Sequence, residues 1–168
     1  MADNLELTTG MLKKLSINSN RIKITPLIKI LCQFNGGCLP ELLNCEMRNK
    51  YNENLQFIQS LANEDVTGIG QKEFNQNSIV PGKRFLVTNH LKNRFIEVYP
   101  KNFTNMGADR TFALKGYLSI TIRQFYYVRH CVNLLYPHLP LVCVAGGGIH
   151  EYFYPIECLN FVEVEEHK

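Results

Sequence analysis

The chain has 168 residues, of which 45% are hydrophobic and 20% charged, and its formal net charge is +3. This composition is typical of a folded globular protein and excludes a disordered one. No stretch approaches the roughly 18 apolar residues that a membrane helix needs. The polar, acidic start excludes a standard secretory signal. We therefore expect an intracellular protein, cytoplasmic or nuclear, without membrane contact.

The six cysteines include no C-x-x-C pair, so the usual spacing of zinc knuckles and redox motifs is absent. Cys131, Cys143 and Cys158 lie in apolar segments, which predicts buried free thiols in a reducing compartment. The histidines lack metal-binding spacing such as H-E-x-x-H, and no paired carboxylates accompany a nucleophile or base. We expect no catalysis, no metal and no cofactor.

Positive charge is concentrated in the middle of the chain. Residues 83–130 contain nine lysines and arginines against two acidic residues, Glu97 and Asp109. The end of the chain is acidic instead, with Glu163, Glu165 and Glu166. A basic middle with neutral or acidic flanks indicates a polyanionic partner, although solvated charged faces are also common.

Helical spacing of apolar residues begins after an N-terminal extension, residues 1–24. It predicts helices over about 25–64, with Thr25 and Pro26 at the start. A break is expected at 35–37 and a second interruption at 52–54. Glycines and prolines then predict irregular structure over 65–82.

From residue 83 onward the pattern changes to short β-branched and aromatic runs, with one helix among them. Residues 84–88 and 94–99 are expected to form a hairpin, and 121–132 a helix with Thr121 as its N-cap. Three further strands and one turn complete the prediction: strands at 111–114, 139–145 and 156–164, and a turn at 146–148. Helices followed by a small barrel with one helix inserted make an α+β plan.

Aromatic and basic residues interleave between His90 and Tyr154. Proteins that bind single strands use rings to stack bases and cations to hold phosphates. For any one ring, packing in the core of a barrel is an equally good explanation. That explanation weakens on the predicted helix, because one helix cannot bury all of its crowded members: Phe125, Tyr126, Tyr127, Arg129 and His130.

Several motifs resemble the PAZ domain of the Argonaute family. Residues 121–126, T-I-R-Q-F-Y, and 134–140, L-L-Y-P-H-L-P, resemble a helix start T-V-x-Q-Y-F and the L-x-Y-P-x-L-P run that follows it. Residues 154–160, Y-P-I-E-C-L-N, are similar to the closing strand L-P-L-E-x-C-N. Upstream, 87–90 and 111–114 are similar to V-T-H and T-F-P-L. The Dicer form of PAZ lacks the Y-P-x-L-P run, so the Argonaute form is the nearer one.

The resemblance covers about residues 83–162 and implies a small SH3- or OB-like barrel with an appended hairpin and helix. Residues 83–168 would form this PAZ barrel and its pocket, and the helical region 25–82 leads into it and contains an insertion. The pocket of the family holds the 3′ end of a small single-stranded guide RNA in RNA silencing. Cleavage in that family resides in a separate RNase H-like domain, and the other Argonaute domains would be partners of this one.

Four candidate site residues precede the predicted helix. By resemblance, His90 corresponds to a phosphate-contacting histidine and Phe112 to a pocket aromatic. Phe95 stands where a phosphate-binding tyrosine is usual. Arg94 is a further candidate for a phosphate contact.

The other four candidates are Phe125, Arg129, His130 and Tyr154. The first three correspond to a tyrosine, lysine, tyrosine set on the helix, and Tyr154 to an apolar residue under the terminal sugar. Binding is expected to strengthen as the pH falls from about 8 to 6, because an imidazolium donates from both nitrogens. The missing hydroxyls at Phe95 and Phe125 leave an alternative open. In it, the barrel has lost its ligand and the N-terminal helices dock a protein partner.

Overall fold

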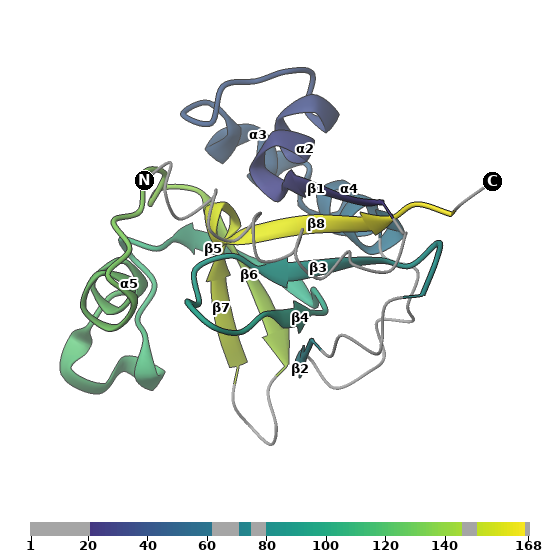
Figure 1. Cartoon of the computed structure of the whole chain (residues 1–168). Coiled ribbons are helices and arrows are strands. Elements are labelled where there is room, and N and C mark those ends of the chain that lie inside the picture. The colour runs from purple at the N-terminus through teal and green to yellow at the C-terminus, as the bar shows by residue number, and fades with distance from the viewer. Residues whose placement is uncertain (1–20, 62–70, 75–79, 146–150, 167–168) are drawn as a thin grey trace.

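The computed structural model describes residues 21–61, 71–74, 80–145 and 151–166. Its strands form two antiparallel sheets, and helices pack against them (Figure 1). Within these ranges no helix is both long and apolar enough to cross a membrane. The α+β class expected from the sequence is confirmed.

The larger sheet has five strands in the order β1-β8-β3-β4-β2. Their bounds are as follows: β1 Ile22–Pro26, β2 Gln71–Glu73, β3 Arg84–Thr88, β4 Ile96–Val98 and β8 Leu159–Val164. Strand β8 pairs with β1 on one side and with β3, the central strand, on the other, where Leu86 faces Phe161. The predicted hairpin is confirmed, since β3 pairs with β4.

The smaller sheet has three strands, β5 (Asn102–Gly107), β6 (Pro140–Ala145) and β7 (Glu151–Pro155), in that order. β6 is in the centre, and Val142 faces Tyr154 across the β6–β7 ladder. The 3-10 helix η4 (Ile156–Cys158) connects β7 to β8 and so links the two sheets through the chain. The turn predicted at residues 146–148 lies outside the described residues.

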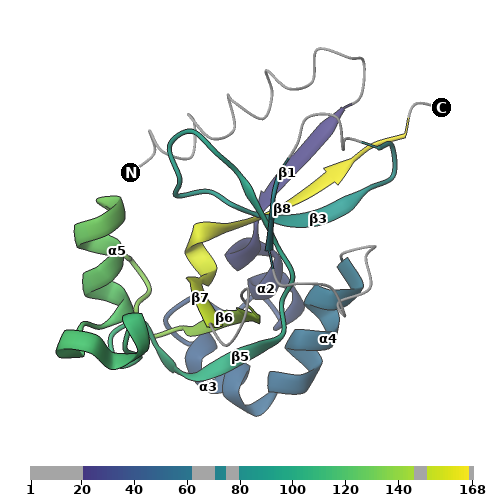
Figure 2. The same ribbon diagram turned by 90° about the horizontal axis from the view of Figure 1, so that it is seen from below.

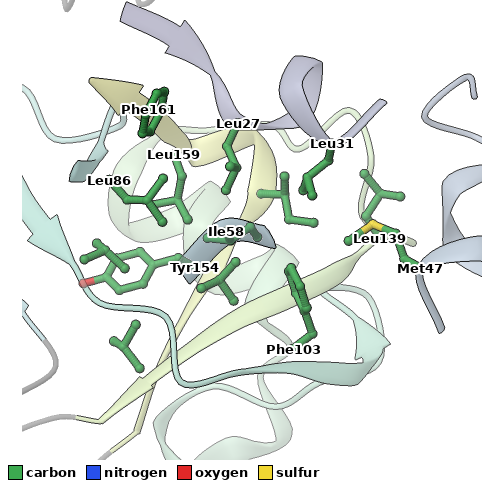
Figure 3. Packing of buried hydrophobic residues seen from close by; sticks show 14 of the residues in the cluster. Leu27, Leu31, Met47, Ile58, Leu86, Phe103, Leu139, Tyr154, Leu159 and Phe161 are labelled. Atoms are coloured by element: carbon green, nitrogen blue, oxygen red, sulfur yellow. The ribbon is translucent and has the colours of Figure 1, made fainter. Parts of the chain in front are cut away.

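Three helices follow β1 in sequence and share a core with both sheets. They are α2 (Leu27–Phe34), α3 (Leu43–Asn49) and α4 (Tyr51–Leu61). Their buried side chains pack with those of β3, β5, β6, β7, η4 and β8 in one apolar cluster, shown in part in Figure 3. The break predicted at 35–37 is confirmed, because α2 ends there and both glycines have φ near +77°. The second break is at Lys50 rather than at 52–54.

A fourth helix, α5 (Ile122–His130), stands on the other side of the molecule from α4 (Figure 2). Its start was predicted correctly. The Thr121 hydroxyl accepts the Gln124 backbone N–H at 3.2 Å, and Gln124 Oε1 accepts the Thr121 N–H at 3.0 Å. This reciprocal capping box satisfies two backbone donors at the helix start. Ile122 and Tyr126 are the buried residues of α5, and they anchor it to a second apolar cluster.

The expected barrel requires correction, because the described strands form two separate sheets rather than one closed one. β4 ends at Val98, and Pro100 then stands where the chain crosses to β5. Proline has no N–H to continue a ladder. The next residue, Lys101, donates its N–H to the Cys143 carbonyl at 2.9 Å and so joins the smaller sheet.

Three local predictions also differ from the structure. Residues 111–114 form no strand, only a single bridge between Phe112 and Thr121, followed by the 3-10 segment η3 (Leu114–Ser119). β1, β2, β5 and β7 were not predicted, and β2 lies within residues 65–82, which were expected to be irregular. All six cysteines are free, and Cys143 and Cys158 are buried as expected, but Cys131 is exposed at the end of α5.

Candidate functional site

A cavity of about 1080 Å³ lies between α5 and the sheets. It is lined by residues 112–116, by one side of α5, by part of the segment 90–96 and by strand β7. Figures 1 and 2 both show α5 at one side of the molecule. The volume is at the upper end of the range of about 300–1,000 Å³ that is usual for small-molecule pockets. It therefore has room for a ligand larger than a single small molecule.

Six of the eight candidate residues line this cavity, although they are far apart in sequence. They are His90, Arg94, Phe112, Phe125, His130 and Tyr154. They come from the β3–β4 connection, the segment before α5, α5 itself and β7. The fold thus brings together residues that were selected from separate sequence motifs.

The other two candidates do not line the cavity. Phe95 is 8% exposed and packs beside Phe85 and Val87 in an apolar cluster of the larger sheet. Its carbonyl accepts the Phe74 N–H at 2.8 Å, which places Phe95 in the sheet edge. Arg129 is exposed on the last turn of α5.

Aromatic rings and imidazoles form one connected cluster at the base of the cavity. The His90 ring centroid lies 4.7 Å from that of His130, at 78° between the planes, and 5.0 Å from that of Tyr126. His130 also lies 5.1 Å from Tyr126 and 5.7 Å, edge to face, from Phe125. Edge-to-face contacts of this kind favour fixed ring positions. The cluster therefore holds both imidazoles in place.

Tyr126 is the buried anchor of this cluster. It is 3% exposed, and its hydroxyl donates to the Phe153 carbonyl at 3.3 Å, which ties α5 to β7. Burial raises the pKa of Tyr126 well above 10.0, so this hydroxyl remains protonated and able to donate. After the helix, the Glu157 carboxylate accepts the N–H groups of Leu135 and Tyr136 at 2.9 and 3.0 Å. The chain that leaves α5 is thereby fixed to η4.

Both histidines of the cavity are neutral at pH 7. Burial, then the charges of His130 and Arg94, lower the pKa of His90 to about 3, although a backbone hydrogen bond with Cys158 opposes this. Burial, then Arg129 and Arg94, lower the pKa of His130 below 6.5. The buried Nδ1 of His90 has no hydrogen-bond partner among the described residues. In the free protein His90 therefore gains no imidazolium charge between about pH 8 and 6, which corrects its expected contribution, and His130 gains less than an exposed histidine would.

The charged residues of the cavity wall are both basic. Arg94 and Lys115 line it, and no acidic residue of the described chain does. Two rings on the wall are well exposed, Phe112 at 51% and Tyr152 at 42%. A positive surface with accessible ring faces can hold phosphates and stack bases.

Sequence reasoning missed several residues that line the cavity, among them Lys115, Tyr126 and Tyr152. A signal for Tyr152 was present, because residues two apart in a strand share a face and Tyr154 was already a candidate. Lys115 carried no such signal, since it follows the predicted strand 111–114 and lies in the 3-10 segment η3.

Among the described residues, no three His, Cys, Asp or Glu side chains are grouped so that they could hold a metal ion. In comparisons with known proteins, no family model matches the chain. No curated protein matches it in sequence.

Proposed function

We propose that this chain binds the 3′ end of a small single-stranded RNA, as the PAZ module of an Argonaute-type protein. The observation that carries the proposal is the cavity itself. It combines exposed rings, two basic side chains and no acidic one among the described residues. Single-strand binders hold their ligand by stacking and by phosphate contacts, with little preference for sequence.

Four of the five motifs that resemble the Argonaute PAZ domain contribute residues to this one cavity, and the motif at residues 134–140 does not. Residues 87–90 lead into it through His90, and 111–114 contribute Phe112. Residues 121–126 contribute Phe125, and 154–160 begin at Tyr154. If the motifs matched the PAZ domain only by chance, these segments would have no reason to meet in the folded chain. Their convergence supports the proposal.

Each wall residue has a role in this proposal. Phe112 and Phe125 stack on the terminal nucleotides, and Arg94 binds a phosphate. His90 and His130 act as neutral hydrogen-bond donors, each from one ring nitrogen. With Phe95 in the core, the hydrogen-bond set around the phosphate is thin, and stacking carries a larger share of the affinity. The chain is proposed as a binding module without catalysis, which acts beside the other Argonaute domains inside the cell.

A second candidate function is a protein-interaction module with a degenerate cavity. The exposed Leu39 and Leu42, at 64% and 62%, favour it, because they lie between α2 and α3 on the helical side of the molecule. Surface leucines that occur singly are common and need no partner. This alternative predicts no RNA affinity.

A matched pair of variants on α5 tests the RNA proposal. Phe125 lines the cavity, whereas Tyr127 is 64% exposed and does not line it. Phe125→Ala should weaken binding of a single-stranded RNA by about 1–3 kcal/mol, the usual size of a lost base–aromatic stack. Tyr127→Ala should leave the affinity unchanged, and fluorescence anisotropy measures both.

Urea unfolding should first establish that the two variants are folded. Equal losses of affinity in both variants would contradict the assigned role of Phe125. An absence of binding by the unmodified protein would favour the protein-interaction module instead.

A further inference from the structure

Lys115 is a basic residue of the cavity that none of the sequence motifs identified. It lies in η3, among the lining residues 112–116, whereas Arg94 lies in the connection from β3 to β4 and lines the same cavity. No acidic side chain of the described residues lines the cavity, so both cations contribute positive charge to it.

The backbone around Lys115 holds this residue at the cavity wall. Leu114, Lys115 and Gly116 have φ values of 49°, 57° and 82°, in the left-handed region. Residues with a Cβ adopt this region at an energetic cost, and such positions concentrate at functional sites. The loop is closed by backbone hydrogen bonds from Gly116 to Ala113 at 2.9 Å and from Ala113 to Ile120 at 2.7 Å.

The charge of the cavity also makes a second cation important. His90 and His130 are neutral at pH 7, so neither neutralises a phosphate. Arg94 by itself can neutralise only a single phosphate. Lysine is a common phosphate ligand, which acts as a mobile point charge. Its neighbour Phe112 offers an exposed ring to the same wall, as base stacking beside a phosphate contact requires.

We propose that Lys115 is a second phosphate-binding residue, which holds the RNA strand in the same cavity as Arg94. This inference rests on the proposed RNA-binding function and adds a contact that the PAZ resemblance did not supply. The cavity then has two cations, from separate segments of the chain, that bind phosphates. The expected ligand is a strand with at least two phosphates within the cavity.

The test measures the affinity of a short single-stranded RNA at several salt concentrations. Each phosphate contact on a single strand contributes about −0.7 to the slope of log K against log salt. Lys115→Gln should therefore reduce the slope by about 0.7 and weaken binding about fivefold at ~0.1 M salt. Lys115→Arg should retain both properties. Lys29→Gln, which removes an exposed charge on α2 outside the cavity, should change neither.

The outcomes distinguish this inference from the function on which it rests. If the unmodified protein binds RNA but Lys115→Gln keeps its slope and affinity, Lys115 does not contact a phosphate and only this inference is overturned. The same holds if Lys29→Gln has an equal effect, because the change would then reflect net charge. If the unmodified protein does not bind RNA, the proposed function is overturned as well. Urea unfolding of Lys115→Gln shows that a loss of affinity is not a loss of fold.

Discussion

His90 makes the stability of the folded chain depend on pH. The unfolded chain takes up a proton at this residue near pH 6.5, whereas the folded chain does so only near pH 3. Between these values the unfolded state binds more protons, so the free energy of unfolding falls as the pH is lowered. For this one residue the loss between about pH 7 and 5 amounts to about 2 kcal/mol.

Urea unfolding at the two pH values checks this expectation. His90→Gln keeps an uncharged polar side chain and removes the titration, so the variant should lose about 2 kcal/mol less than the unmodified protein. An equal loss in both proteins would show that His90 is not buried in its neutral form. Other groups that titrate in this range contribute to both proteins and cancel in the comparison.

At the scale of single residues, the sequence predicted the chemistry of the site better than its geometry. Motif order identified His90, Phe112 and Phe125, and all three line the cavity. Phe95 and Arg94 are neighbours, and only the arginine reaches the cavity, because Phe95 packs into the core of the larger sheet. Which of two adjacent side chains faces the core depends on strand pairing, and the sequence alone does not show it.

At the scale of elements, α5 carries a large part of the site and depends on its N-cap. Thr121→Ala removes the hydroxyl that accepts the Gln124 N–H, and should reduce the free energy of unfolding by about 1 kcal/mol. Thr121→Ser keeps an acceptor and should retain most of the stability. Equal stability of the Ala and Ser variants in urea unfolding would show that the cap contributes nothing.

Elements were predictable where local chemistry determines them. The capping box of Thr121 and Gln124 has a recognisable spacing, and β3 has a run of β-branched and aromatic residues. β5 (Asn102–Gly107) has the polar sequence N-F-T-N-M-G and becomes a strand through its ladder with β6. η3 has positive φ at residues other than glycine, which no local preference predicts. Tertiary contacts override local propensity at both places.

At the scale of the whole molecule, the observed fold differs from the predicted one mainly because segments far apart in the sequence pair as strands. β1 lies near residue 22 and β8 near residue 164, yet they pair over five residues. α2 to α4 share one apolar cluster with strands of both sheets, so the helical half of the chain is not independent of the rest. Alternation of apolar and polar residues predicted the positions of several strands. It does not predict which strands pair with one another, or that the two sheets remain separate.

The central claim is that the cavity binds the end of a strand rather than its middle. The most direct measurement titrates the protein with two RNAs of one sequence, one with a free 3′ end and one blocked by a 3′ phosphate. The free-ended RNA should bind more tightly by about 1–3 kcal/mol, because a block leaves groups at the end of the strand without their partners in the cavity. Equal affinity for both RNAs, or no affinity for either, would contradict the account.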